Sequence, residues 1–260
     1  MTTRPRILVR PPSGQLEDGE LTHLERQPVD AALARTQWDA YRAAFTAHGW
    51  EVQQIEAAED QPDGVFVEDV VVMVDDAAIL TSPGADSRRG EVESMARALE
   101  ALREQGEPIT VHQITAPGTL EGGDVLKVGS TVYVGRSSRT NDEGIAQLTA
   151  IVEPLGRTVV TVPLTMALHL KTAVTALPDG TVIGYEPIVD DPSIFPRFLA
   201  VPEAEGTAVV VLDETTVLLS AHAPQTAELL RARGLTVVTT PVTEFEKLEG
   251  CVTCLSVRLR

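Results

Sequence analysis

The chain has 260 residues, and its 21 Lys and Arg against 38 Asp and Glu give it a formal net charge of −17 at pH 7. Such an acidic chain is poorly suited to nucleic-acid backbones and anionic membranes, and it suits a small cationic ligand. A hydrophobic content of 43% is typical of a globular protein that buries a core.

The N-terminal sequence lacks the apolar run of a signal peptide, and no segment approaches the roughly 18 apolar residues of a membrane span. Cys251 and Cys254 are the only cysteines, too few for a secreted disulfide scaffold. We therefore expect a cytoplasmic protein without a membrane partner, acting as a monomer or homodimer.

The predicted elements follow a repeated order along the chain. The N-terminal part gives a strand over 6–12, a helix over 29–49 and a strand over 51–57. The next units each give two strands, a helix and a third strand: 65–75, 77–83, 90–106 and 108–115, then 122–128, 130–137, 141–156 and 157–164. A shorter unit has strands over 170–177 and 181–187 and a proline-broken helical segment near Phe195. The last units are 207–213, 215–221, 224–234 and 235–241, and a final strand over 254–259 that completes the N-terminal unit.

Five similar α/β units, the last closed by the two termini, predict a ring of ββαβ blades, a five-bladed α/β propeller formed by one domain over residues 1–260. A doubly wound parallel sheet is the alternative, but the short connection between the first two strands of each unit favours antiparallel hairpins. In a ring, equivalent positions of the units converge on the central axis.

In four of the five units, polar residues break the apolar pattern in or beside the first strand, and buried unpaired carboxylates are costly. These residues are Glu68 and Asp69, Glu121 and Asp124, His169 and Lys171, and Cys254. Each one alone is readily explained as a structural residue. Their equivalent positions predict instead that a thiol, an imidazole and several carboxylates meet at one site.

The two cysteines allow four interpretations: a redox pair, half of a metal site, core filling, or one nucleophile beside a second thiol. A redox Cys-x-x-Cys pair opens a helix, whereas a β-branched strand follows Cys254. The other histidines form no cluster that would complete a zinc site. We therefore predict that Cys254 is a nucleophile, with His169 and Glu121 as base and orienting carboxylate. Cys251 is either a spectator thiol or a partner for a reversible disulfide or an inhibitory zinc ion.

Carboxylates beside a thiolate raise its pKa, so their presence favours a positively charged substrate. A guanidinium group is planar, always charged and matched to carboxylates. Asp69 and Glu121 could hold its nitrogens over the sulfur of Cys254, while His169 protonates the departing amine. A covalent thiouronium would form and then be hydrolysed.

Six spaced segments, FVEDV, GADSRRGE, GTLEGGDVLKVG, GRSSRTNDEG, LHLKT and CLSVRL, resemble the dimethylarginine dimethylaminohydrolase family of the guanidino-group-modifying superfamily. The resemblance runs from about Arg10 to the end of the chain. It implies a five-bladed α/β propeller that hydrolyses N-omega-methylated arginines to citrulline and methylamines, with no metal or organic cofactor.

The resemblance also implies roles for individual residues. Cys254 would be the nucleophile, His169 the proton donor and acceptor, and Glu121 the third member of the triad. Substrate would be bound by Asp69 and Glu68 at the guanidinium, Arg88 and Arg139 at the carboxylate, Asp63 at the α-ammonium group, and backbone groups near Leu21 and Leu248. The segment QLEDGELTH would be a lid.

Three rival functions remain. An arginine deiminase of the same superfamily would act on unmethylated arginine, although such enzymes tend to carry an inserted helical domain for which the continuous repeat leaves no room. An amidinotransferase would pass the amidino group to an amine instead of water. A non-catalytic binding or redox-sensing protein for arginine derivatives would carry no catalytic thiol.

Overall fold

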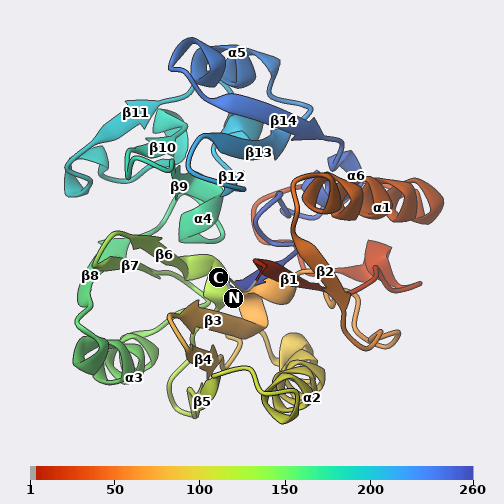
Figure 1. Cartoon of the computed structure of the whole chain (residues 1–260), viewed down its shortest axis with the longest axis vertical. Coiled ribbons are helices and arrows are strands. Elements are labelled where there is room, and N and C mark those ends of the chain that lie inside the picture. Colours follow the sequence, from red (N-terminus) through yellow and green to blue (C-terminus); the bar gives the residue numbers. More distant parts are fainter. Residues whose placement is uncertain (1–3, 260) are drawn as a thin grey trace.

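The computed structural model describes residues 4–259, whose strands form five three-stranded sheets arranged around one axis (Figure 1). In each sheet the inner and middle strands are antiparallel, and the middle and outer strands are parallel. The predicted propeller is confirmed, including the blade in which the C-terminal strand β15 pairs with β1.

The strands of the five blades, from inner to outer, have the following bounds. They are β3 (Val71–Val74), β4 (Ala77–Leu80) and β5 (Thr110–Gln113); β6 (Val125–Val128), β7 (Thr131–Arg136) and β8 (Thr158–Pro163); β9 (Val174–Ala176), β10 (Val182–Gly184) and β11 (Phe198–Ala200); β12 (Val209–Val211), β13 (Thr216–Ser220) and β14 (Thr236–Thr240); and β15 (Val257–Leu259), β1 (Arg6–Val9) and β2 (Glu51–Gln54).

The four longer helices lie on the outside of the ring, and each connects the middle strand of a blade to its outer strand (Figure 1). The longer ones are α1 (Ala31–Ala47), α2 (Glu91–Glu104), α3 (Asp142–Val152) and α5 (Pro224–Ala232). Asp30 caps α1 by accepting from the amides of Ala32 and Leu33, and Asn141 caps α3 by accepting from Gly144. No helix in residues 4–259 has the length and apolar character needed to cross a membrane.

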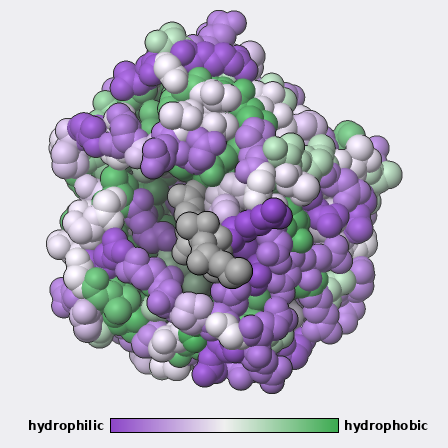
Figure 2. Space-filling model, in the orientation of Figure 1, coloured by the Kyte–Doolittle hydropathy of each residue, from purple (hydrophilic) through white to green (hydrophobic). Residues whose placement is uncertain are grey.

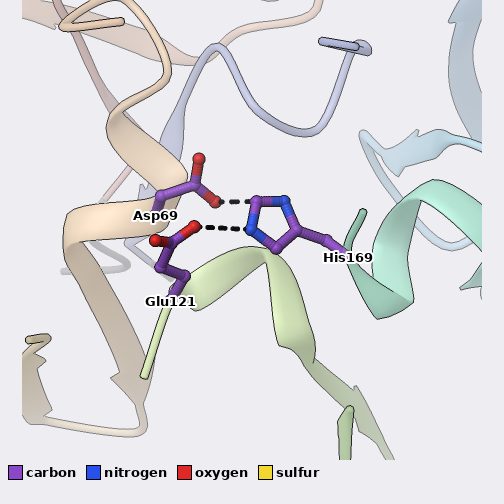
Figure 3. A group of neighbouring side chains, drawn as sticks. All are labelled: Asp69, Glu121 and His169. Carbon is purple, nitrogen blue, oxygen red and sulfur yellow. Dashed lines mark hydrogen bonds and ion pairs between the residues drawn. The ribbon is translucent and has the colours of Figure 1, made fainter. Parts of the chain in front are cut away.

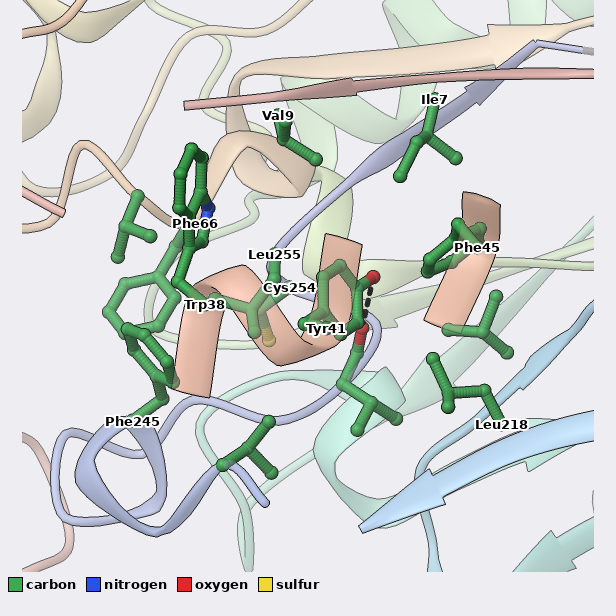
Figure 4. Close-up of a cluster of buried hydrophobic side chains, with 14 of the residues drawn as sticks. Ile7, Val9, Trp38, Tyr41, Phe45, Phe66, Leu218, Phe245, Cys254 and Leu255 are labelled. Atoms are coloured by element: carbon green, nitrogen blue, oxygen red, sulfur yellow. Dashed lines mark hydrogen bonds between the residues drawn. The ribbon is translucent and has the colours of Figure 1, made fainter. Parts of the chain in front are cut away.

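Hydrophobic side chains fill the spaces between neighbouring blades, so the core consists of five clusters around the ring. One of them packs β1 and α1 against the blade of β12 and β13, and its members include Trp38, Tyr41, Phe45, Phe245 and Cys254 (Figure 4). Each blade therefore depends on its neighbours for burial, which makes the ring one packing unit.

Short helical turns precede the inner strands, and here the sequence-based prediction was wrong. Glu68 and Asp69 were expected inside a strand, but they lie on the 3₁₀ helix η2 (Val67–Val70), with β3 starting after it. Likewise η4 (Gly122–Asp124) precedes β6, and α4 (Leu170–Ala173) precedes β9. The apolar residues of the turn and those of the strand that follows it are all buried. The spacing of apolar residues in the sequence therefore could not show where the turn ends and the strand begins.

One strand and one short α-helix were missed, as were the 3₁₀ helices η1 (Leu16–Asp18), η3 (Asp86–Arg88) and η8 (Ala204–Gly206). The strand β11 follows two short 3₁₀ helices, η6 (Glu186–Ile188) and η7 (Pro192–Ile194), which are the predicted proline-broken segment. The short helix α6 (Thr243–Glu246) leads toward the turn that carries Cys254. The missed elements are at most four residues long, too short for a periodic pattern.

Candidate active site

The turns before the inner strands bring polar residues from different blades to the axis of the ring. Asp69 lies on η2, Glu121 directly precedes η4, His169 is the N-cap residue of α4, and Cys254 lies in the turn before β15. All four side chains are buried, with at most 5% of each residue exposed. The equivalent-position argument from the sequence therefore led to residues that do converge.

His169 faces two carboxylates, those of Asp69 and Glu121, which lie on the same side of its ring (Figure 3). Its Nε2 is 2.6 Å from Oε2 of Glu121, and its Nδ1 is 3.9 Å from Oδ1 of Asp69. Glu121 is fully buried, and its other oxygen accepts from the amide of Gly84 at 3.0 Å. This hydrogen bond fixes the carboxylate and, through it, the orientation of the imidazole ring.

The electrostatics of this group keep His169 protonated. Burial alone would lower the pKa of His169, but the charge of Asp69 and the hydrogen bond to Glu121 outweigh it and raise that pKa to about 9. Burial would raise the pKa of Glu121, but its hydrogen bond to His169 and nearby arginines lower that pKa to about 2. At neutral pH the two residues therefore form an imidazolium–carboxylate pair.

Asp69 is held by two donors besides its contact with His169. Its Oδ2 accepts from Nη1 of Arg88 at 2.7 Å, and its Oδ1 accepts from the amide of Gly123 at 3.0 Å. Arg88 is itself buried and forms a bidentate pair with Glu91, with Nε and Nη2 donating at 3.0 and 2.9 Å. The guanidinium of Arg88 is thus fixed at the edge of the site by two carboxylates.

The glycine pair in EGGD is explained by close packing at the axis. A Cβ added to Gly122 would lie 1.9 Å from the carbonyl oxygen of Glu68. A Cβ added to Gly123 would lie 2.7 Å from both Asp69 and His169. Only glycine lets η4 approach the other two turns this closely.

Cys254 belongs to the hydrophobic cluster that fills the space beside α1 (Figure 4). Its Sγ is 3.2 Å from Sγ of Cys251, and the amide of Cys251 lies 3.4 Å from the same sulfur. The hydrogen bond between the thiols lowers the pKa of Cys251 and raises that of Cys254, as expected where two sulfurs share a proton. Burial and the charges of Glu68 and Asp69 add to the increase at Cys254. The predicted nucleophile is therefore a neutral thiol when no substrate is bound.

Most of the predicted site residues border one small cavity of about 20 Å³. Those that do are Asp63, Asp69, Arg88, Arg139, His169, Leu248 and Cys254. Asp63 accepts from the amide of Glu20 at 2.9 Å, and burial raises its pKa. Glu121 does not border the cavity itself, but it contacts His169, which does.

Leu21 and Glu68 lie elsewhere. Leu21 packs against the hydrophobic cluster beside α1, and the preceding residue, Glu20, borders the cavity instead. The side chain of Glu68 lies on the other side of the η2 turn and accepts from Lys171 at 2.7 Å and Arg258 at 2.5 Å. Glu68 and Lys171 line a separate cavity of about 390 Å³ between the inner strands. The face of the molecule seen in Figure 2 is hollowed near its centre and mostly hydrophilic.

Sequence comparison identifies relatives of this chain over nearly its whole length. The family model described as N,N dimethylarginine dimethylhydrolase, eukaryotic, matches residues 22–175. An N(G),N(G)-dimethylarginine dimethylaminohydrolase of Streptomyces coelicolor is 55% identical over 98% of this chain and 97% of its own length. The chain belongs to the dimethylarginine dimethylaminohydrolase family.

Solved structures agree with this assignment. A dimethylarginine dimethylaminohydrolase of Pseudomonas aeruginosa, a mutant complexed with citrulline, superimposes with a TM-score of 0.88 at 34% identity and covers 98% of each chain. The N-terminal domain of ArgZ, an arginine dihydrolase of cyanobacteria, matches with a TM-score of 0.82 at 22% identity, which supports the fold alone. The family resemblance and the fold predicted from the sequence are both confirmed.

Two residues shape the site in ways that the sequence did not predict. Glu91 orients Arg88, and it lies in the quoted segment GADSRRGE. Asp124 was among the polar residues predicted to converge on the axis, but no role was predicted for it. It accepts from the amide of Leu170 at 2.9 Å and from the hydroxyl of Ser137 at 2.7 Å, and its charge adds to the raised pKa of His169.

Asp69, Glu121 and His169 are also the group in residues 4–259 whose spacing would suit a metal ion, since their ligand atoms lie within 4.8 Å of one another. The charges around them do not suit one. Nη1 of Arg88 lies 3.9 Å from Glu121, and Nη1 of Arg139 lies 3.6 Å from it. Two guanidinium groups and an imidazolium already neutralise these carboxylates, so we derive no metal chemistry here.

Proposed function

We propose that this protein hydrolyses N-omega-methylated L-arginine to L-citrulline and dimethylamine or methylamine, through a covalent intermediate on Cys254, and that residues 1–260 form a single catalytic domain. The observation that carries the proposal is the buried His169 imidazolium, held between Asp69 and Glu121 at the cavity that Cys254 also borders. Both the 55% identical relative and the Pseudomonas aeruginosa structure complexed with citrulline support it.

The substrate itself supplies the charge that the resting site lacks. Asp63 and Glu20 also border the cavity, and their carboxylates suit the guanidinium and the α-ammonium group. A guanidinium beside Cys254 lowers the pKa of that thiol, which releases its proton to solvent. The thiolate therefore forms where and when the electrophilic carbon is in place.

The chemistry then needs one acid and one base, and His169 provides both in turn. The thiolate adds to the guanidinium carbon, and the imidazolium of His169 protonates the methylated nitrogen as its bond to carbon breaks. The amine leaves, and an S-alkylthiouronium remains on Cys254. Neutral His169 then takes a proton from water, whose oxygen adds to the same carbon. The carbon–sulfur bond breaks and the hydroxyl group of the adduct gives its remaining proton to solvent, which releases citrulline and regenerates the thiolate.

Arg139 and Arg88 differ in how free they are to bind the substrate carboxylate. Arg139 donates to the hydroxyl of Thr22 at 3.2 Å and lies 3.6 Å from Glu121. Arg88 is held by Asp69 and Glu91. We propose that Arg139 contacts the substrate carboxylate directly. Arg88 contributes to substrate binding mainly through its positive charge and through its hydrogen bond to Asp69.

The test is product formation from asymmetric dimethylarginine, with arginine and the Cys254→Ser variant measured in parallel. We expect citrulline and dimethylamine from the methylated substrate, negligible ammonia from arginine, and no turnover by the variant. Citrulline and ammonia from arginine would make the protein a deiminase. Transfer of the amidino group to an added amine would make it an amidinotransferase. No turnover with any substrate would leave a binding pocket and contradict the mechanism.

A further inference from the structure

The predicted catalytic pocket is too small for its substrate in this structure. Its cavity of about 20 Å³ has room for about one water molecule. A methylated arginine is far larger, so part of the wall must move before the substrate can reach Cys254. The wall includes Glu20, Leu248, Glu249 and Gly250, which belong to two segments far apart in the chain.

The first of these segments is the lid loop, which we define as residues 14–26, between β1 and α1. Side chains on the body of the protein hold its middle part. Asp63 accepts from the amide of Glu20, Ser87 donates to the carboxylate of Glu20 at 2.6 Å, and Arg139 donates to Thr22. Two of these, Asp63 and Arg139, are proposed substrate contacts, so the lid and the substrate share the same side chains.

Glu249 holds the lid loop in a different way. Its Oε1 accepts from three successive amides, those of Thr22, His23 and Leu24, at 3.1, 2.5 and 2.6 Å. Successive amides that converge on one oxygen form an anion-binding concavity, and a carboxylate is a good occupant. Glu249 lies five residues before Cys254 in the chain, so it joins the lid loop to the segment that carries the nucleophile.

The backbone of Glu249 is unusual for its residue type. Its φ is 59°, in the left-handed region that favours glycine and is uncommon for other residues. A carboxylate kept at such a position, where glycine would relieve the strain, indicates that the side chain is needed there.

We infer that Glu249 is a positioning residue: its carboxylate fastens the lid loop over the active site and so places Thr22 against Arg139, the residue that binds the substrate carboxylate. Substrate enters when the three amides leave Glu249 and is enclosed when they return. The apparent affinity for substrate then depends on how much of the protein has the loop fastened. This inference rests on the proposed function for its kinetic part, but not for the loop itself.

The experiment compares Glu249→Gly, Glu249→Asn and Glu249→Gln. Glycine removes the carboxylate and relieves the backbone, so any loss comes from the missing contact and not from strain. Asparagine tolerates a left-handed backbone but has a shorter side chain, and glutamine keeps the acceptor oxygen without the charge. Glu17→Gln is the matched control, because Glu17 is an exposed carboxylate on the same loop.

Two quantities are measured on each variant: amide hydrogen exchange of Thr22 to Leu24, and the kinetics with asymmetric dimethylarginine. For Glu249→Gly and Glu249→Asn we expect exchange to accelerate and KM to rise, each about tenfold or more, with kcat within about threefold of the parent. Glu249→Gln should fall between these variants and the parent. Glu17→Gln should match the parent in both.

Three outcomes would overturn the inference. Unchanged exchange in Glu249→Gly would mean that the carboxylate does not hold the loop. Faster exchange with an unchanged KM would mean that the held loop does not position the substrate. A fall in kcat alone, with KM unchanged, would place Glu249 in the chemical step. A parent protein without turnover would contradict the proposed function, while the exchange measurement would still decide whether Glu249 fastens the loop.

Discussion

At the scale of single residues, neighbours in the sequence have opposite surroundings in the structure. Asp69 faces His169 and the catalytic cavity, whereas Glu68 faces Lys171 and Arg258. The sequence showed that two acidic residues interrupt an apolar run, but not that they sit on a helical turn that points them apart. Residue types and approximate position were therefore predictable, and the direction of each side chain was not.

The pKa of His169 leads to a prediction about activity against pH. His169 must be protonated to donate to the leaving amine, and its raised pKa of about 9 keeps it so at neutral pH. We therefore expect kcat/KM to fall as pH increases through about 9, because the acid is lost there. Glu121→Gln removes a charge that raises this pKa, so the falling limb should move to lower pH by about one unit or more.

The measurement is the pH–rate profile of both proteins with asymmetric dimethylarginine between pH 6 and 10.5, with citrulline formation as the readout. A low residual activity of Glu121→Gln is sufficient, because the test compares the pH at which kcat/KM falls and not the size of kcat/KM. A parent profile that still rises at pH 10, or the same falling limb in both proteins, would show that His169 is not the acid that limits the reaction.

At the scale of elements, the site depends on how closely three turns approach one another. The sequence predicted the strands and helices from their apolar periods, but η2, η4 and α4 are only three or four residues long and leave no periodic signal. The two glycines of EGGD, which belong to η4, were the sign in the sequence that these turns pack closely. Those glycines read as an ordinary turn until the structure showed that each lies against another blade.

Replacing Gly123 by alanine tests this close approach. The added Cβ would lie 2.7 Å from Asp69 and from His169, so both side chains, and the bond from the Gly123 amide to Asp69, must shift. We expect kcat/KM to fall about a hundredfold, because a displacement on the order of 1 Å at a catalytic group has that effect. Gly14→Ala is the control, since its Cβ would meet no atom within 4 Å. Equal activity of Gly123→Ala and the parent would show that the turns have room to separate.

At the scale of the whole molecule, the repeat predicted the ring and its closure by the two termini, because each unit leaves a recurring pattern of β-branched runs. The interactions across the axis left no such pattern. Glu68, Lys171 and Arg258 come from the blades of β3, β9 and β15, and Arg258 also donates to the carbonyl groups of Thr253 and Ser256 beside the nucleophile. Residues 190 positions apart meet here only because the ring closes.

The last prediction concerns this contact between three blades. Burial would raise the pKa of Glu68, but Lys171 and Arg258 lower it overall, so the carboxylate is charged and neutralises two cations. Glu68→Gln would leave those cations without their partner near the axis, and breaking a buried ion pair in this way is strongly destabilising. We expect the free energy of unfolding to fall by about 3 kcal/mol, measured by urea denaturation at pH 7.

Glu56→Gln is the matched control, because Glu56 pairs with Arg97 at 2.7 Å but both side chains are about 60% exposed. An exposed pair contributes little, so this variant should lose less than about 1 kcal/mol. If both variants lost the same small amount, the axial contact would be no stronger than a surface pair. The stability of the ring would then come from the five hydrophobic clusters between the blades. A large loss in Glu68→Gln alone would mean that the charged contact across the axis stabilises the ring and supports the turns that carry Asp69, His169 and Cys254.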